Sequence, residues 1–502
     1  MQKDMLKNIM YIKSPLIAVL VFFISAVVFS QYGFVGTLVR DDANYVYSGQ
    51  QMAQGIPPYK SIFDYKGPIA PMISGAGATV ARLFNTDDIL IIRITFLIVS
   101  CFVVVGIYFL GTILFESSRT GFLSALAFIG FYGFGRHAAS GPRAKTPMVL
   151  FEVLSLLLTA KKKWFWAGIC GSLAFLTWQP TVIYLVVTIF LAFTQSEQVR
   201  VRARSVLLAV SGALIPIIAV SIYFLLNGAF LDFIDGTVLF NIKNLEHGPF
   251  SLLGNLGEPI SAVYKAYTIM TIPIILGFFM LFVIYMWRIK LHGKKIIPLV
   301  SKDHFAAFLL TFPFPVLWSV LYFQSYPDFY VLLPYAAIGF GWLLYLAIDA
   351  LNGIEEIGAG LKKAFYLVLC IGLIGGAAIV YRRASENGLV EQRQWAHQIK
   401  HKFEPDLRLV SIGAPEVLVL LHQTNPNPYV YIVNGIDKRI DEKTQEGFNG
   451  WLEELERYDP SVIAFGQTRG RFKPKLLKWL ETHFQETKIG DWTLFIKNSN
   501  LK

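Results

Sequence analysis

The sequence has few charged residues and few cysteines for its length. Only 16% of its 502 residues are charged, whereas 54% are hydrophobic, and the mean hydropathy is +0.51. Cys101, Cys170 and Cys370 all lie inside apolar runs, with no CxxC pair and no neighbouring histidine. A disulfide framework and a zinc site therefore have no support. Internal repeats and low-complexity tracts are absent as well.

Apolar residues, in contrast, occur in blocks of about twenty, the length that crosses a bilayer as a helix. The net charge of +11 comes mostly from Lys and Arg in the short gaps between these blocks, so it does not indicate nucleic-acid binding. We expect an all-α polytopic membrane domain with about eleven transmembrane helices. Their predicted ranges are 15–36, 89–114, 121–135, 147–160, 164–180, 181–195, 205–226, 266–287, 305–323, 330–350 and 364–381.

The positions of the cations predict the orientation of these helices. Lys and Arg are enriched in the cytoplasmic loops of membrane proteins. Lysines 161–163 and the arginines of 200–204 flank the block 164–195, so we expect both ends of this block to be cytoplasmic. The block then crosses outward and returns at Gln179-Pro180. The same rule places the N-terminus in the cytoplasm of a multi-pass cell (inner) membrane protein, and the first loop and the C-terminus outside. Segment 69–84 is short for a transmembrane helix, and one more crossing there would place the later lysine clusters on the outer side of the membrane. We therefore expect a re-entrant or interfacial helix.

Hydropathy falls after Tyr381, and the pattern becomes that of a soluble domain. Strands are predicted at 407–412, 429–433, 461–465 and 492–496, with helices at 415–422, 442–457 and 474–483. Alternating strands and helices indicate a small α/β domain. The expected organisation is a transmembrane domain over 1–381, with its first outer loop at 37–88, and an extracytoplasmic α/β domain over 382–502.

The first outer loop concentrates groups that could carry chemistry. Asp41 and Asp42 directly follow a predicted span, where partial desolvation raises a carboxylate pKa and favours general-base catalysis. A short helix is expected from Asp42 until Gly55-Ile56-Pro57-Pro58, and its dipole opposes that shift. Lys66, before Gly67-Pro68, suits a lipid phosphate. A solvated loop without chemistry is the competing interpretation.

The order of residues in this loop resembles a known pattern. Asp41-Asp42-Ala43-Asn44-Tyr45, then Met52-Ala53-Gln54-Gly55, then Tyr59 and Lys66-Gly67-Pro68-Ile69, is similar to the first extracytoplasmic loop of GT-C superfamily glycosyltransferases. The branch of protein O-mannosyltransferases and lipid A aminoarabinose transferases is the most similar. Arg93 and the segment Thr177–Pro180 extend the resemblance through about the first 200 residues.

The resemblance implies roles for individual residues. Asp41 matches the family's catalytic aspartate, Asp42 the acid beside it, and Lys66 the lysine associated with the lipid phosphate. The implied donor is a polyprenyl-phosphate-linked sugar. In the second outer loop, where many relatives carry an Asp, this chain has Arg143 and Lys145, which either hold the donor phosphate or anchor the end of a span.

Other residues are weaker candidates for lining a substrate cavity. These candidates are Tyr45, Tyr59, Arg93, His137 and Asp328. His137, beside Arg136, is more typical of a boundary residue than of a ligand, and no spacing marks a metal site. The sequence leaves the need for a divalent cation open.

These observations favour an inverting glycosyltransferase that transfers a sugar to a hydroxyl of a glycan, lipid or protein acceptor. The alternatives are a transporter or flippase of lipid-linked sugars and a non-catalytic subunit of a cell-envelope glycan assembly. A transporter is expected to carry ionisable residues at mid-membrane depth. Arg93 and Glu152 are the main charges inside the predicted spans. The sugar and the acceptor are not determined.

Overall fold

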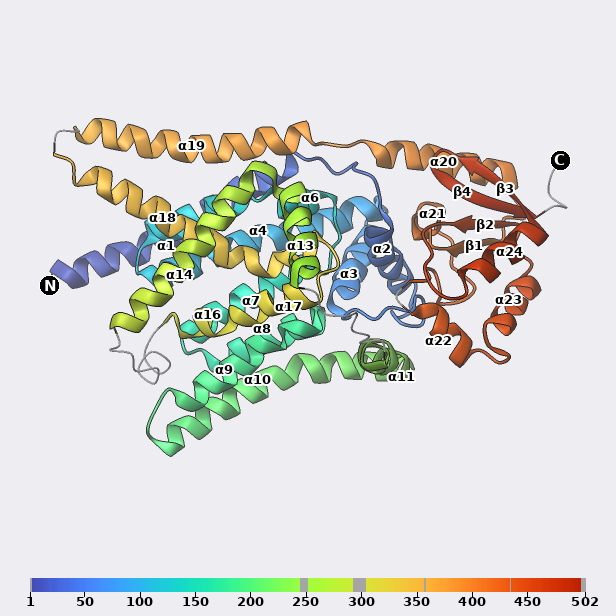
Figure 1. Ribbon diagram of the computed structural model, residues 1–502, viewed down its shortest axis with the longest axis horizontal. Coiled ribbons are helices and arrows are strands. Elements are labelled where there is room, and N and C mark those ends of the chain that lie inside the picture. Colours follow the sequence, from blue (N-terminus) through green and yellow to red (C-terminus); the bar gives the residue numbers. More distant parts are fainter. Residues whose placement is uncertain (1, 244–251, 292–303, 356–357, 434, 498–502) are drawn as a thin grey trace. The chain divides into compact units, whose positions relative to one another are not determined.

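The computed structural model describes residues 2–243, 252–291, 304–355, 358–433 and 435–497 (Figure 1). Each of the eleven predicted apolar runs is helical over most of its length in it. Contacts divide the chain into two compact units. The helical unit consists of Met1–Phe34, Arg93–Val220 and Gly248–Ser385, and the mixed unit of Val35–Ile92, Ser221–His247 and Glu386–Lys502.

The helical unit is built from long apolar helices with short connections. Its helices are α1 (Gln2–Ser30), α4 (Asp88–Phe115), α5 (Ser118–Ile129), α6 (Tyr132–Ser140), α7 (Lys145–Ala160), α8 (Trp164–Thr177), α9 (Val182–Thr194), α10 (Val199–Leu226), α13 (Leu252–Tyr267), α14 (Thr271–Leu291), α16 (Ala306–Thr311), α17 (Pro313–Leu321), α18 (Leu333–Asn352) and α19 (Ala359–Arg383). The first residues of α4 and the last of α10 belong to the mixed unit. The chain breaks between α8 and α9 at Gln179–Thr181, as the Gln179-Pro180 turn predicts.

Within the part of the chain that is described, five helical segments are long and apolar enough to cross a membrane. They are Asp88–Phe115, Val199–Leu226, Pro259–Arg288, Tyr326–Asn352 and Ala359–Phe403. Shorter apolar helices lie at Pro15–Ser30, Trp164–Thr177, Gln179–Thr194 and Ala306–Leu321. The helices follow the predicted runs, whereas the count of eleven crossings stays a prediction.

Close helix packing in the helical unit depends on glycine. Helices α14 and α18 pack together so closely that a Cβ atom at Gly277 would collide with the carbonyl of Ala336, and one at Gly339 with the carbonyl of Gly277. Small residues at such crossings let helix backbones touch, which replaces the hydrophobic driving force that lipid does not supply.

The mixed unit joins segments far apart in sequence. It combines the first outer loop with α11 (Phe230–Ile234), a π-helical turn at Asp235–Phe240, α12 (Asn241–Lys243) and the C-terminal α/β part. The sequence predicts a boundary at 381/382 that leaves the loop with the transmembrane helices. By contacts, the loop instead shares a compact unit with the C-terminal segment.

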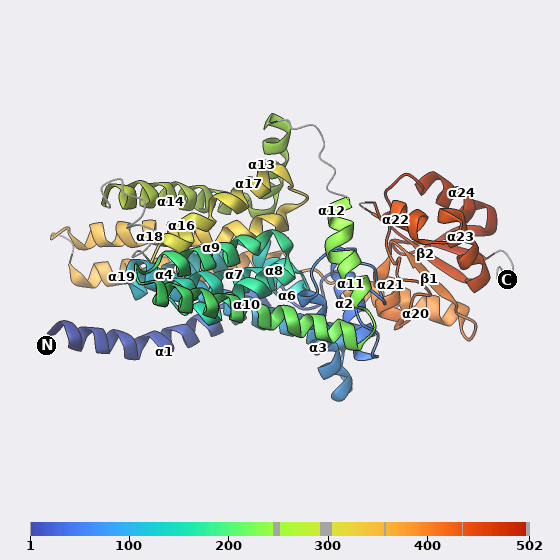
Figure 2. The same cartoon turned by 90° about the horizontal axis from the view of Figure 1, so that it is seen from below.

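Two helices form most of the first outer loop. The predicted short helix is α2 (Arg40–Ala53), and segment 69–84 is α3 (Ile69–Leu83), which packs on α2 (Figure 2). A Cβ atom at Gly49 would lie 2.7 Å from the carbonyl carbon of Ser74, so only glycine permits this approach. At about 1.5 Å per residue, α3 is too short to span a bilayer.

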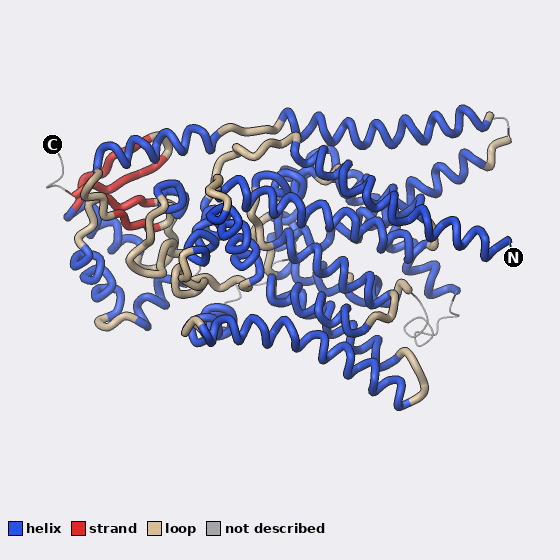
Figure 3. Tube along the Cα trace, turned by 180° about the vertical axis from the view of Figure 1, so that it is seen from behind, coloured by secondary structure: helices blue, strands red, loops and turns tan. Residues whose placement is uncertain are grey.

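The strands of the described residues all lie in the C-terminal part, where Figure 3 draws them in red. They form one four-stranded sheet in the order β1-β2-β4-β3. The strands are β1 (Leu409–Ile412), β2 (Val462–Phe465), β3 (Phe484–Ile489) and β4 (Trp492–Lys497), and only β1 and β2 are parallel. Helices α20 (Gly388–Phe403), α21 (Pro415–Leu421), α22 (Ile436–Lys443), α23 (Gly447–Tyr458) and α24 (Lys473–His483) surround the sheet. The predicted combination of a small sheet and helices is present after Tyr381, as part of the mixed unit.

Three details of the C-terminal prediction are wrong. Residues 430–433 are buried but form no strand, because their carbonyls accept hydrogen bonds from Gly413 and Arg469 instead of from a continuous neighbouring strand. The predicted helix 442–457 is two helices, since Glu446 and Gly447 adopt positive φ angles of 65° and 67°. The polar edge strand β3 was not predicted, because its exposed face lacks apolar alternation.

Candidate functional site

The two aspartates of the first loop occupy the first turn of α2, as predicted. They differ in exposure: the side chain of Asp41 is 38% exposed, whereas Asp42 is only 2% exposed. A carboxylate in the first turn is stabilised by the helix dipole. Of the two acids, Asp41 is the one accessible to solvent.

Lys66 lies on a loop whose backbone is held from several sides. Oδ1 of Asp64 accepts hydrogen bonds from the backbone amides of Tyr65 and Lys66, at 2.8 and 3.1 Å, and from the hydroxyl of Tyr431 at 3.0 Å. The hydroxyl of Tyr59 donates to the carbonyl of Lys66 at 2.7 Å. These contacts fix the backbone position of Lys66.

The ammonium of Lys66 and the carboxylate of Asp41 interact electrostatically. Burial by itself lowers the pKa of Lys66, but the charges that Tyr45 and Tyr65 carry when ionised, together with the carboxylates of Asp41 and Asp64, outweigh burial and raise the pKa well above its usual value. Lys66 Nζ lies 5.4 Å from the centre of the Tyr45 ring. Lys66 thus contacts Tyr45 and Tyr59, and its charge interacts with that of Asp41; all four residues were selected from the sequence.

The C-terminal part of the mixed unit holds the segment that leads into α2. The side-chain amide of Gln392 accepts from the backbone N–H of Leu38 at 2.8 Å and donates to its carbonyl at 3.0 Å. Arg40, whose Nη2 lies 3.6 Å from Asp41, donates to the side chain of Gln467 at 2.9 Å. These residues position Asp41 from α20 and from the loop after β2.

Glu416, in the first turn of α21, also belongs to this neighbourhood. Burial raises its pKa from 4.5 to about 7, and the positive charge of Arg40 offsets this only partly. Among the described residues, its buried Oε2 has no hydrogen-bond partner. The folded state therefore favours the protonated form of this side chain.

We expect Glu416→Gln to remove a pH-dependent loss of stability. Because the folded-state pKa lies above the unfolded value, Glu416 costs nothing below about pH 4.5 and costs up to about 3 kcal/mol once the pH rises above 7. Thermal unfolding in detergent between pH 5 and pH 8 should show a falling wild-type Tm relative to the variant. Glu481→Gln, at an exposed position, is the control. Parallel curves for wild type and Glu416→Gln would contradict the prediction.

Two further candidates are fully or nearly buried in the helical unit. The guanidinium of Arg93 donates to the carbonyl oxygens of Phe34 at 2.6 Å and Gly141 at 3.3 Å, contacts that join three chain segments. His137 shares a 2.5 Å hydrogen bond with the hydroxyl of Tyr326. Burial, Arg143 and Arg136 lower the pKa of His137, so its ring is neutral.

Lys145 and Asp328, two candidates chosen independently, form an ion pair. Lys145 Nζ lies 3.2 Å from Oδ1 of Asp328 and 3.1 Å from the centre of the Trp178 ring. Asp328 Oδ2 also accepts from the backbone amides of Gln324 and Ser325. Asp328 therefore balances the charge of Lys145, and a phosphate would have to compete with this carboxylate.

Several residues that build the site were not selected from the sequence. Gln392, Glu416, Tyr431 and Gln467 lie in chain segments that carry no recognisable motif, whereas Asp64 lies in the first loop, two residues before Lys66. Only Asp64 had a local signal, since an Asp before a turn often accepts from the amides that follow it. Among the described residues, no three His, Cys, Asp or Glu side chains gather as a metal site.

Searches with protein-family models and among curated proteins gave no match. Solved structures do match. The chain is similar to ArnT from Cupriavidus metallidurans in the apo state, with a TM-score of 0.56 and 13% identity, over 97% of this chain and 98% of that one. The same ArnT bound to undecaprenyl phosphate gives a TM-score of 0.54 at 12% identity, over 97% of both chains.

An archaeal protein shares the same architecture. The Archaeoglobus fulgidus oligosaccharyltransferase in its apo form gives a TM-score of 0.53 at 14% identity, over 90% of this chain and 69% of that one. Both ArnT and this oligosaccharyltransferase are members of the GT-C superfamily. At such identities the similarity concerns the fold alone, and it agrees with the resemblance of the first loop. The chain has a GT-C fold.

Proposed function

We propose that the protein is an inverting glycosyltransferase that moves a sugar from a polyprenyl-phosphate carrier to an acceptor hydroxyl at the extracytoplasmic face of a cell membrane. The observation that carries this proposal is an accessible carboxylate, Asp41, whose charge acts on the half-buried ammonium of Lys66. A GT-C fold and apolar helices long enough to cross a membrane support it.

In the proposed reaction, the acceptor oxygen attacks the anomeric carbon as the bond from that carbon to the phosphate oxygen breaks. Asp41 takes the proton of the attacking hydroxyl, and polyprenyl phosphate leaves with the bonding electrons. A single displacement inverts the anomeric configuration. Asp42 lies buried beside Asp41 in the same helix turn.

Lys66 supplies positive charge where the leaving phosphate gains negative charge. Its raised pKa keeps the ammonium charged at neutral pH. Arg143 and Lys145 are further proposed phosphate ligands; Lys145 would exchange its carboxylate partner Asp328 for the phosphate. The ring of Tyr45 lies near the Lys66 ammonium, and the hydroxyl of Tyr59 donates to the Lys66 carbonyl.

The test is sugar transfer by the purified protein from a panel of polyprenyl-phosphate sugars to glycan, lipid and peptide acceptors. Transfer must be accompanied by an equal amount of released polyprenyl phosphate. A flippase would instead move the intact lipid-linked sugar across vesicles without breaking this bond. Movement without cleavage for every donor in the panel would refute the proposal.

A further inference from the structure

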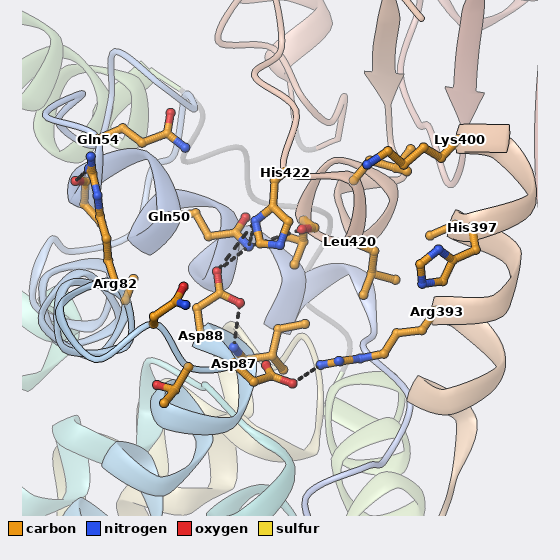
Figure 4. A pocket seen from close by; sticks show the side chains of 18 residues that line it. Gln50, Gln54, Arg82, Asp87, Asp88, Arg393, His397, Lys400, Leu420 and His422 are labelled. Atoms are coloured by element: carbon orange, nitrogen blue, oxygen red, sulfur yellow. Dashed lines mark hydrogen bonds and ion pairs between the residues drawn. The ribbon is translucent and has the colours of Figure 1, made fainter. Parts of the chain in front are cut away.

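A cavity of about 800 Å³ lies in the mixed unit, away from Asp41. Its walls come from the end of α2, the connection between α3 and α4, helix α20 and the end of α21 (Figure 4). Ala53, which lines it, follows Asp41 by twelve residues on the same helix, or about 18 Å along the axis. The cavity and the proposed reaction centre are therefore at opposite ends of α2.

Side chains at one wall of the cavity are held in place before any ligand arrives. The Gln50 side-chain amide donates to Asp88 Oδ2 at 2.8 Å and to the carbonyl of Val419 at 3.1 Å. Arg393 forms an ion pair with Asp87, and Figure 4 shows both pairs at the cavity wall. Groups fixed in this way lose little conformational freedom when they bind a ligand.

The charges around the cavity nearly cancel. Arg82, Arg393 and Lys400 are cations, and Asp87 and Asp88 are carboxylates. This balance does not favour a nucleic acid or another polyanion, which requires a strong excess of positive charge.

The neutral part of the lining is rich in hydrogen-bonding groups. It includes the amides of Gln50, Gln54 and Asn85 and the imidazoles of His397 and His422, but no Phe, Tyr or Trp side chain. A nucleic-acid base usually stacks on a large aromatic side chain, so a lining without Phe, Tyr or Trp does not favour a planar base as the ligand. A ligand whose every hydroxyl both donates and accepts would use the mixture of carboxylates, amides and cations fully.

We propose that this cavity binds a neutral oligosaccharide, the part of the acceptor glycan remote from the reacting hydroxyl. The hydroxyl groups of the sugar units would donate to Asp88 and Asp87 and accept from Gln54, Arg82 and His397. The identification of this glycan as the acceptor rests on the proposed function, whereas glycan binding itself does not.

The experiment measures direct binding to the full-length protein in detergent micelles, with no catalysis required. The probes are neutral hexose oligosaccharides of increasing length, a uronic-acid oligosaccharide and inorganic phosphate. His397→Ala should weaken binding of the neutral probes about tenfold or more. His401→Ala, an exposed histidine one turn further along α20 and outside the cavity, should leave it unchanged. Gln54→Ala provides a second cavity variant from another helix.

Three results would overturn the proposal: no saturable binding of neutral probes up to about 10 mM, binding of anionic probes only, or equal binding by the His397→Ala and wild-type proteins. The proposed function fails separately. Specific glycan binding without any sugar transfer would support oligosaccharide binding in the cavity and contradict the proposed glycosyltransferase activity. Sugar transfer to long acceptors with an unchanged acceptor KM in His397→Ala would support the glycosyltransferase activity and contradict acceptor binding in the cavity.

Discussion

Replacing Asp41 by Asn is expected to lower the rate of sugar transfer by about two to four orders of magnitude, the usual contribution of a general base. Asn keeps the shape of the side chain but cannot accept the proton of the attacking hydroxyl. Because 38% of this side chain is exposed and it lies in the first turn of α2, the helix should form normally. The measurement is kcat and kcat/KM with a donor from the active panel, together with the Tm.

The controls separate a catalytic role from a structural one. Glu391→Gln, at an exposed position of α20, should leave the rate unchanged. A rate within about tenfold of wild type for Asp41→Asn would remove Asp41 as the base. If Asp42→Asn lost activity at an unchanged Tm while Asp41→Asn did not, Asp42 would be the general base, despite its 2% exposure.

Replacing Lys66 by Met should reduce kcat/KM for the lipid donor by about two to three orders of magnitude, because one preorganised charge facing the leaving phosphate is lost. Met keeps the length and apolar stem of the side chain. The effect should extend to binding of polyprenyl phosphate without a sugar, measured as a weaker Kd. Lys66→Arg should recover part of the loss, since it restores the charge but not the point-like ammonium.

Lys60 offers a matched control within the same loop. It is exposed, and its ammonium donates a hydrogen bond to the backbone carbonyl of Asn227 at 3.4 Å. Lys60→Met should therefore change donor kinetics by less than about threefold. An equal loss in Lys60→Met and Lys66→Met would indicate general attraction of the anionic donor to a positive loop. The phosphate would then not be bound specifically at Lys66.

Much of the local structure could be predicted because it depends on local signals. Asp41 and Asp42 begin a helix that ends before Gly55, and Gln179-Pro180 separates two helices, since proline and glycine act on the chain next to them. The apolar runs gave the positions of the long helices for the same reason. The segment 429–433 shows the limit of such signals: apolar residues predict burial, but hydrogen-bond partners decide whether a buried segment is a strand.

The surroundings of the candidate site could not be predicted, because they come from segments hundreds of residues apart. Gln392 binds Leu38 and Tyr431 binds Asp64 through side chains that stand in no motif. The pairing of Lys145 with Asp328 is of the same kind: each residue could be selected from the sequence, but not their contact.

By itself, the sequence determined that the chain is rich in apolar helices, that a small α/β part follows them, and that acids and a lysine share the first outer loop. These properties follow from composition and short-range periodicity. Only the tertiary structure decided that this loop packs in one unit with the C-terminal part, that Asp41 is accessible while Asp42 is buried, and that a polar cavity lies at the far end of α2. The reason is that exposure and charge coupling depend on which distant side chains pack together, and local sequence does not encode that.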